Sequence, residues 1–127
     1  MINRYEHQGV VWVDVEAPTE EDIQSLEQEF SLGHLLAEEL LRPTVKPHVD
    51  IYPEFAYAVF NFPSVRHTHG GSVTQEVDMI IGKRFLLTVH YDTIPAIYDF
   101  ARSFEAATLL TAIVVLDHHR HGALEDV

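Results

Sequence analysis

Residues 73–90 of the 127-residue chain read VTQEVDMIIGKRFLLTVH, and this stretch predicts two consecutive strands. Apolar and polar side chains alternate from residue 73 to residue 81, which is the period of a half-buried strand. Gly82-Lys83-Arg84 is the expected turn, and the apolar run over residues 85–90 is the expected second strand. Strands joined by so short a turn pair antiparallel, so we expect an antiparallel sheet here.

Three further strands are expected before this stretch. Residues 48–52 and 55–62 are two of them, and the two-residue gap Pro53-Glu54 between them favours a hairpin. Near the start of the chain, Val10-Val11-Trp12-Val13-Asp14-Val15 is rich in β-branched residues and indicates a buried strand. Trp12 is therefore expected in the interior of the protein.

Two helices are expected between the first strand and the hairpin. Thr19 and Asp22 have the spacing of a capping box, in which each side chain bonds the backbone of the other residue. Apolar residues recur along one face from about Glu20 to Phe30, which predicts an amphipathic helix over that range. A second, shorter helix is expected from Leu35 to Leu41, and Pro43 ends it.

A third helix is expected after the last strand. Asp92 or Thr93 can cap it, with Pro95 in its first turn, and we expect it to run from about residue 94 to about residue 117. The order is then one strand, two helices, four strands and a long helix. Strands grouped in this way predict an α+β fold with a largely antiparallel central sheet and helices packed on its faces.

The composition limits the classes of partner. The chain has 8 Lys and Arg against 20 Asp and Glu, so its formal net charge is −12. Nucleic-acid phosphates and anionic lipid headgroups repel such a protein, whereas divalent cations are attracted to it. The absence of cysteine excludes disulfides, thiolate metal sites and cysteine nucleophiles.

The acids are concentrated in the first third of the chain. Residues 16–39 hold eight acids and no Lys or Arg. One interpretation is a solvated helix face. The other is that some of these carboxylates face a neighbouring subunit and share a hard cation there. Mg²⁺ uses only one or two carboxylates and keeps several waters, so Glu38 and Glu39 could serve.

The nine histidines form two clusters that could bind zinc, at His67-Thr68-His69 and at His118-His119-Arg120-His121. Neither has a carboxylate or thiolate partner at a recognisable ligand spacing. His90 ends an apolar strand and is expected to be a hydrogen-bonded structural residue rather than a base.

Catalytic motifs are missing from the sequence. It has no G-x-S-x-G elbow and no phosphate-binding glycine loop. A triad of His90 and Asp92 with Ser64, Ser72 or Ser103 can be drawn, as it can for any chain of this length. We therefore expect that the protein is not an enzyme.

Three segments carry a family resemblance through their order and spacing. They are Trp12-Val13-Asp14-Val15-Glu16-Ala17-Pro18 with Glu20-Glu21, then Glu38-Glu39-Leu40-Leu41 with Lys46-Pro47-His48-Val49-Asp50-Ile51-Tyr52, then Glu76-Val77-Asp78-Met79-Ile80-Ile81-Gly82-Lys83 with Leu86-Leu87-Thr88-Val89-His90. Together they resemble the N-terminal cytoplasmic domain of CorA-type magnesium transporters.

The resemblance implies a mixed αβα sandwich, with residues 1–127 as a single regulatory domain at the inner face of the cell membrane. It implies a homopentamer in the full-length protein, in which Mg²⁺ bound between neighbouring domains holds the pore shut. The family's cation-binding acid falls on Glu39, next to Glu38. Its partner acid lies on a stalk helix, which this chain lacks along with the transmembrane helices and the Gly-Met-Asn pore motif, so the chain is expected not to conduct ions by itself.

Two functions therefore remain open. The first is a cation-sensing regulatory domain of a CorA-like transporter of magnesium or another divalent metal ion. The second is a small stand-alone zinc-binding protein or metal-dependent enzyme that uses the histidine clusters: His67, His69, His118, His119 and His121. Since the family includes zinc-transporting relatives, Zn²⁺ is also a candidate for the metal in the first.

Overall fold

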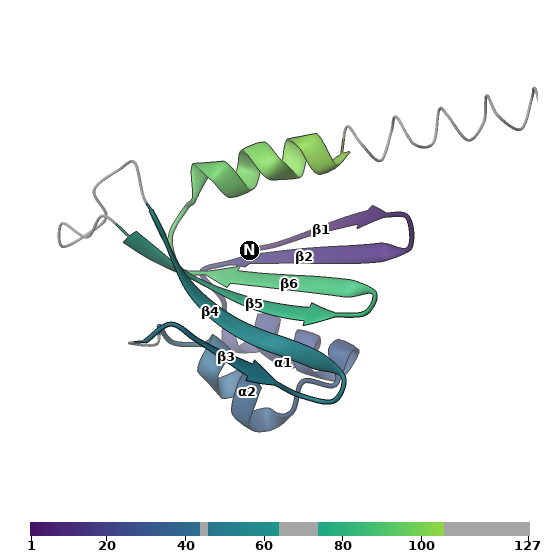
Figure 1. Ribbon diagram of the computed structural model, residues 1–127, viewed down its shortest axis with the longest axis vertical. Coiled ribbons are helices and arrows are strands. Elements are labelled where there is room, and N and C mark those ends of the chain that lie inside the picture. The colour runs from purple at the N-terminus through teal and green to yellow at the C-terminus, as the bar shows by residue number, and fades with distance from the viewer. Residues whose placement is uncertain (44–45, 64–73, 106–127) are drawn as a thin grey trace, which may run out of the picture.

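A six-stranded sheet forms the centre of the structure, a computed structural model that describes residues 1–43, 46–63 and 74–105 (Figure 1). The strand order is β1-β2-β6-β5-β4-β3. The strands are β1 (Ile2–His7), β2 (Val10–Glu16), β3 (His48–Ile51), β4 (Phe55–Pro63), β5 (Thr74–Gly82) and β6 (Phe85–His90).

The sheet is mixed. The pairs β1–β2, β3–β4, β4–β5 and β5–β6 are antiparallel, whereas β2 and β6 pair in parallel. In that parallel pair, Asp14 lies opposite Thr88, a residue 74 positions later in the chain. The expected α+β class with a largely antiparallel sheet is confirmed, and one long-range parallel pairing is added to it.

Two helices cover one face of the sheet, α1 (Glu20–Phe30) and α2 (His34–Leu40) (Figure 1). The capping box is present, because the Thr19 hydroxyl accepts from the Asp22 backbone N–H and the Asp22 carboxylate accepts from the Thr19 N–H. The bounds of α1 agree with the prediction, and α2 begins and ends one residue earlier than predicted.

A third helical segment, residues 95–105, lies on the opposite face of the sheet (Figure 1). The indole ring of Trp12 packs against the rings of Phe100 and Phe104, at centroid distances of 5.4 and 5.7 Å. Helices on both faces give the layered αβα arrangement. The part of the predicted helix beyond residue 105 lies outside the described residues.

The main apolar core lies between the sheet and the α1–α2 layer. Its fully buried members come from both helices and from four strands: Val13, Val15, Ile23, Leu26, Leu40, Tyr57, Ile80, Leu87 and Val89. The prediction of a half-buried β5 is wrong at the middle of that strand, where Val77, Asp78 and Ile80 are all buried. The reason is that both faces of β5 are covered there.

Two details of the strands differ from the sequence prediction. The first strand, β1, was not predicted, because only every second side chain of Ile2–His7 is even partly buried. It joins β2 through Gln8 and Gly9, which both have positive φ, as a tight hairpin turn requires. The β3–β4 gap is three residues, not two, because Tyr52 is not in β3 and instead donates its N–H to the carbonyl of Phe55.

Part of the sheet face that carries helix 95–105 is exposed. Ile51 pairs with Ala56, Ala56 with Ile81, and Ile81 with Leu86, which in turn pairs with Trp12. Since directly paired residues share a face, the exposed side chains of Ile51 and Ile81 lie on the face that carries helix 95–105. Within the described part of the chain, that helix contacts the side chains of β1 and β2, and several apolar residues toward the other edge stay exposed: Val49, Ile51, Phe60, Phe62 and Ile81.

Candidate functional site

Glu38 and Glu39 lie side by side on the short helix α2, and both are exposed. The Glu38 carboxylate pairs with the imidazole of His34 one turn earlier, with Nε2 3.2 Å from Oε1. The charge of Glu39 acts on the buried hydroxyl of Tyr57: burial, then Asp78, then Glu39 raise the pKa of Tyr57. The two carboxylates therefore have different surroundings, although they are adjacent in sequence.

Two hollows flank α2. One, of about 230 Å³, lies between α1 and α2 and is lined by Glu20, Glu27, His34 and Glu38 together with apolar residues. The other, of about 560 Å³, is lined by residues of both helices and of the segment after α2: Glu20, Leu35, Glu38, Glu39, Leu41, Arg42 and Pro43. Glu20 and Glu38 thus border both hollows. Nothing in the local sequence places Glu20 beside α2, so its position at these hollows was not predicted.

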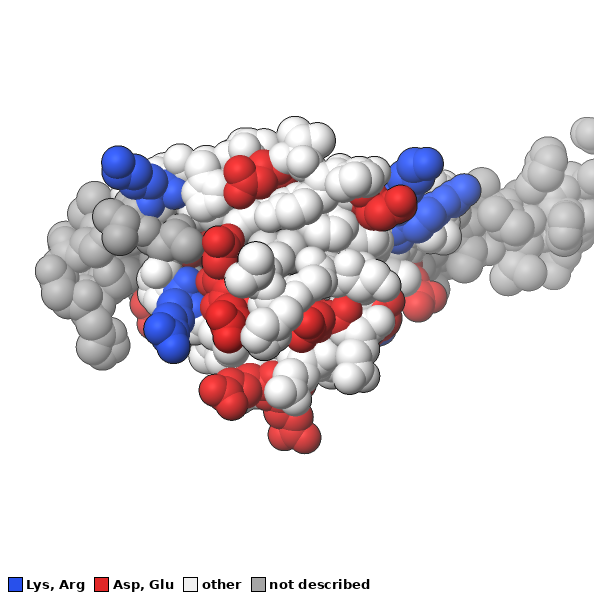
Figure 2. Space-filling model, turned by 90° about the horizontal axis from the view of Figure 1, so that it is seen from below, with Lys and Arg blue, Asp and Glu red and all other residues white. Residues whose placement is uncertain are grey.

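The α1–α2 layer presents its acids to solvent. Figure 2 views the molecule from this side and shows Asp and Glu side chains spread over the face, with Lys and Arg toward its margins. The acids come from both helices: Glu20, Glu21, Asp22, Glu27, Glu29, Glu38 and Glu39. One of them is neutralised at the edge, because both guanidinium nitrogens of Arg4 bond the Glu29 carboxylate at 2.6 and 2.7 Å.

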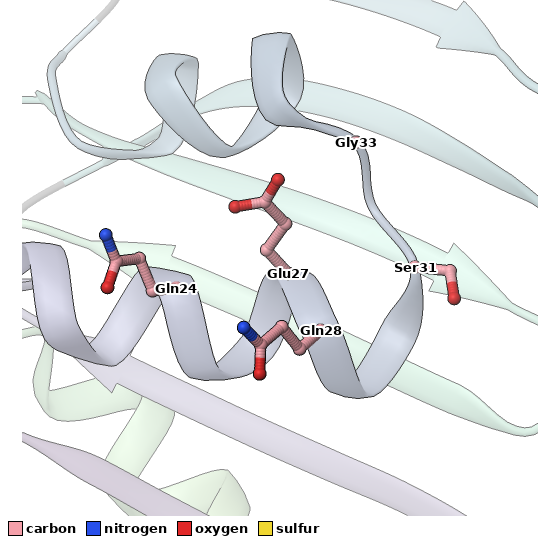
Figure 3. A pocket seen from close by; sticks show the side chains of 5 residues that line it. All are labelled: Gln24, Glu27, Gln28, Ser31 and Gly33. Carbon is pink, nitrogen blue, oxygen red and sulfur yellow. The ribbon is translucent and has the colours of Figure 1, made fainter.

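A third hollow lies at the C-terminal end of α1 (Figure 3). Glu27 points from α1 toward α2, and the amide side chains of Gln24 and Gln28 lie beside it on the same helix. Ser31 and Gly33 complete the lining from the loop between the helices. One carboxylate and two neutral amides form a polar surface without a second charged group, so this hollow adds no ligand set of its own.

The donor chemistry of Glu38 and Glu39 fits Mg²⁺, but the described residues of one chain do not complete a metal site around them. Carboxylate oxygens are the ligands that Mg²⁺ prefers, and it typically binds through one or two of them while keeping several waters. Within residues 1–43, 46–63 and 74–105, no three His, Asp or Glu side chains are grouped closely enough to hold a metal ion. Water and carboxylates of another copy of the chain are suitable further ligands.

A buried polar network lies on the other face of the sheet, and the sequence did not reveal it. The indole Nε1 of Trp12 donates to the Thr88 hydroxyl at 2.9 Å, and that hydroxyl donates to Asp14 Oδ1 at 2.6 Å. The His90 ring meets the same carboxylate, with Nε2 2.9 Å from Oδ2. All four side chains are buried, with exposures of 4% or less. His90 is a buried, hydrogen-bonded residue, as its position at the end of an apolar strand predicted.

A second buried acid, Asp78, lies in the apolar core beneath α1 and α2. Tyr57 donates its hydroxyl to Asp78 Oδ2 at 3.3 Å. Burial, and next the neighbouring Glu76 carboxyl, raise the pKa of Asp78 to about 9, so Asp78 keeps its proton at neutral pH. Tyr91 lies beside this group and donates its hydroxyl to the carbonyl oxygen of Arg42 at 2.8 Å, which ties the segment after α2 to β6.

The alternative sites of the sequence analysis fall mostly outside the described residues. This holds for both histidine clusters (His67, His69, His118, His119 and His121) and for Ser64 and Ser72. Ser103 is described, and its hydroxyl donates to the carbonyl oxygen of Asp99. Both ring nitrogens of His90 are taken up by Asp14 and by the carbonyl oxygen of Asp92, so His90 is not placed to activate Ser103.

Comparison with known proteins gives one family. Residues 7–116 match the family model described as "CorA-like Mg2+ transporter protein". No curated protein sequence matches the chain. In the part of the chain that the structure describes, no helix has the length and apolar character needed to cross a bilayer.

Solved structures share the fold at low sequence identity. The full-length CmaX protein has a TM-score of 0.66 at 14% identity, over 78% of this chain and 31% of that one. The soluble domain of CorA from Methanocaldococcus jannaschii has a TM-score of 0.60 at 19% identity, over 76% of this chain and 38% of that one. The ZntB cytoplasmic domain from Vibrio parahaemolyticus RIMD 2210633 has a TM-score of 0.64 at 11% identity, over 80% of this chain and 41% of that one. The chain therefore spans between about a third and two fifths of the length of these proteins.

Proposed function

The chain belongs to the family of CorA-like Mg²⁺ transporter proteins, and on that premise we propose that it is the cytoplasmic, cation-sensing domain of a divalent metal ion transporter. The observation that carries the proposal is the position of Glu38 and Glu39, exposed on α2 beside two hollows. In this role the domain binds Mg²⁺ between copies and regulates a pore without conducting ions itself. It is a regulatory domain and not an enzyme.

Electrostatics explains how such a domain senses a cation. Each chain carries a formal charge of −12, and acids are spread over the α1–α2 face (Figure 2). Copies held side by side under a membrane repel one another, and a dication between them removes part of that repulsion. Because the cation binds the assembled form and not the separate one, its concentration sets the degree of assembly.

Glu39 is the proposed ligand, and Glu38 assists it. Glu38 already has a partner in His34, at 3.2 Å, whereas Glu39 has no ion-pair partner among the described residues. The second ligand group comes from the neighbouring copy or from water, in keeping with the lack of a three-ligand group among the described residues. We extend the proposal to a homopentamer at the inner face of the cell membrane, attached through transmembrane helices, of which the described part of this chain has none.

Sedimentation velocity of the 127-residue chain tests the proposal. We expect a monomer or a weak dimer in chelator and a shift toward larger species at millimolar Mg²⁺, beyond the shift at the same ionic strength of Na⁺. Glu39→Gln removes the charge of the ligand oxygen. It is expected to raise by several-fold the Mg²⁺ concentration needed for the shift toward larger species.

Glu21→Gln is the matched control, since Glu21 is an exposed acid of α1 that lines neither hollow beside α2. It changes the net charge by the same amount and should leave the Mg²⁺ response near that of the unmodified chain. Equal responses of the two variants would show that general charge, and not a site at Glu39, is responsible. A stable pentamer in chelator would contradict the proposal outright.

A further inference from the structure

The junction between β6 and helix 95–105 contains a pair of titratable side chains, His90 and Asp14, that takes no part in the proposed cation sensing. His90 is the last residue of β6, and its side chain is fully buried. Its Nε2 lies 2.9 and 3.0 Å from the two carboxylate oxygens of Asp14, and its Nδ1 lies 2.7 Å from the carbonyl oxygen of Asp92. Nδ1 therefore faces a carbonyl oxygen, which only accepts a hydrogen bond, and Nε2 faces carboxylate oxygens, which only accept while Asp14 is ionised.

This geometry fixes the protonation state of the ring. A neutral imidazole has one N–H donor and one lone pair, so one of the two contacts would place a lone pair against an oxygen at under 3.1 Å. Only the imidazolium donates to both partners. Asp14 can accept this hydrogen bond together with the one from Thr88, because a carboxylate has about four acceptor positions. The pair is thus a buried ion pair with its hydrogen bonds satisfied.

The same four side chains hold the third helix. We define the junction network as Trp12, Asp14, Thr88 and His90. Its outer end is the ring of Trp12, which contacts Phe100 and Phe104 of the helix. Its other end is the His90 contact with Asp92, three residues before the helix begins. A change in charge at His90 therefore acts on two of the attachments of helix 95–105 to the sheet.

We infer that the junction network is a proton-dependent latch, which holds helix 95–105 on the sheet while His90 is charged and loosens it when His90 loses its proton. The charged groups around the ring favour the closed state. On β2 they are Asp14, and Glu16 with its Oε1 4.0 Å from Nδ1. From the helix, Tyr98 directs its hydroxyl at Glu16, and from β1 the ring of Tyr5 packs on Trp12.

The other two neighbours of His90 bring no positive charge. From β5, the residue paired with it is Val77, and Asp78 points to the opposite face. After β6, Asp92 contributes its backbone carbonyl and has an exposed side chain. The pKa of His90 is raised, because its hydrogen bonds to Asp14 and Asp92 and the nearby carboxylates outweigh the opposing effect of burial.

The direction of the pH effect follows from this raised pKa. The latch stabilises the fold fully below about pH 6.5, the ordinary histidine value, and its contribution is lost as the pH rises through the folded-state pKa of His90. For each unit by which the folded-state pKa of His90 exceeds the ordinary histidine pKa, the latched state is about tenfold more favoured at low pH than at high pH.

Nuclear magnetic resonance of the histidine ring nitrogens in the 127-residue chain is the direct test. We expect His90 to keep protons on both ring nitrogens above pH 6.5, the ordinary histidine value. A neutral His90 ring at pH 6.5 would overturn the inference, and this measurement requires no variant.

Amide hydrogen exchange tests the release. We expect protection factors over residues 95–104 to fall by about tenfold or more as His90 deprotonates, while those of α1 stay constant. In Asp14→Asn the ring loses its anionic partner, so the loss of protection should move to lower pH by one unit or more. His48→Gln is the control and should leave the profile unchanged. If α1 and helix 95–105 lose protection together, or if Asp14→Asn follows the profile of the unmodified chain, there is no latch.

Discussion

On the face covered by α1 and α2, the sheet packs mainly through apolar side chains, and the one acid buried there, Asp78, keeps its proton. On the opposite face, the sheet packs through aromatic rings and a hydrogen-bonded network that contains an ion pair between His90 and Asp14. The first face carries its charges outside, on exposed helix positions. The second has charges inside and apolar side chains exposed nearby.

This difference suggests a division of labour. An apolar core of this kind holds the α1–α2 layer, and with it Glu38 and Glu39, mainly through contacts between uncharged side chains. The network under helix 95–105 depends on protonation, so the attachment of that helix can change while the rest of the fold stays intact. The predictions below test whether the two faces differ in this way.

The largest effect is expected at Trp12. Replacing it with alanine removes the ring that contacts Tyr5, Phe100 and Phe104, and should lower the free energy of unfolding by about 3–5 kcal/mol. Urea denaturation followed by far-ultraviolet circular dichroism measures this. Trp12→Phe keeps much of the packing but not the bond to Thr88, and should cost less. An unchanged transition in Trp12→Ala would mean that the network face contributes nothing to stability.

Leu40 is the counterpart on the α1–α2 face. Its side chain is fully buried in the apolar core, and Leu40→Ala should cost about 2–5 kcal/mol. Leu35 lies on the same helix but is 80% exposed, so Leu35→Ala should change the free energy of unfolding by no more than about 0.5 kcal/mol. Similar costs for the two variants in urea denaturation would show that α2 is not anchored through this core.

Asp78 gives the apolar face its own pH dependence. Its pKa is about 9 in the fold and 3.8 ordinarily, so the native state holds a proton that the unfolded state releases. For this group, stability is therefore highest below pH 3.8 and falls as the pH rises toward 9. Asp78→Asn replaces the protonated acid with a neutral side chain of the same shape. The free energy of unfolding, measured by urea denaturation at pH 5, 7 and 9, should then depend less on pH.

Asp50→Asn is the control for this prediction, since Asp50 is an exposed acid of β3. Its profile should follow that of the unmodified chain. If Asp78→Asn keeps the same slope as Asp50→Asn, the buried acid is not protonated and the comparison between the faces fails on this point.

The smallest effect is expected at the edge of the α1–α2 layer. Arg4 and Glu29 are 42% and 38% exposed, so Glu29→Gln should cost only about 0.2–1 kcal/mol, and less at 1 M salt. The Arg4 guanidinium lowers the pKa of Glu29, so its stabilisation is present above the ordinary value of 4.5 and is lost as the pH falls. The stabilisation by Glu29 is therefore lost as the pH falls, whereas the stabilisations by Asp78 and by the His90–Asp14 pair are lost as the pH rises. Thermal unfolding of Glu29→Gln and of the unmodified chain at pH 3 and pH 7 measures this stabilisation. If the two chains differ in stability by the same amount at both pH values, the prediction is wrong.

Local signals in the sequence predicted the local elements. The Thr19–Asp22 capping box fixes the start of α1, because both hydrogen bonds lie within four residues. The strands β2, β4 and β6 were predicted because their apolar side chains are numerous, and β5 was predicted because apolar and polar side chains alternate along it. The edge strand β1 was missed because its apolar content is low, although the Gln8-Gly9 pair before the valine run was a usable turn signal.

The partners of the buried polar groups could not be predicted, since they come from distant segments of the chain. Asp14 and His90 become neighbours only through the parallel pairing of β2 with β6. Asp78 alternates with apolar residues along β5 and was expected on a polar face, and its burial follows from the position of α1 and α2 over that strand. Glu38 and Glu39 were predicted as candidate ligands by resemblance, and their exposure on α2 agrees with that hypothesis without testing it.

The parallel pairing of β2 with β6 also has a consequence for biosynthesis. Residues 10–16 leave the ribosome early, but their hydrogen-bonding partner in the middle of the sheet is not made until residues 85–90 follow. Closing so distant a contact is slow compared with forming the hairpins β3–β4 and β5–β6. The nascent β1–β2 hairpin therefore has an unpaired, valine-rich edge until residues 85–90 have been made, which is the kind of surface that chaperones bind.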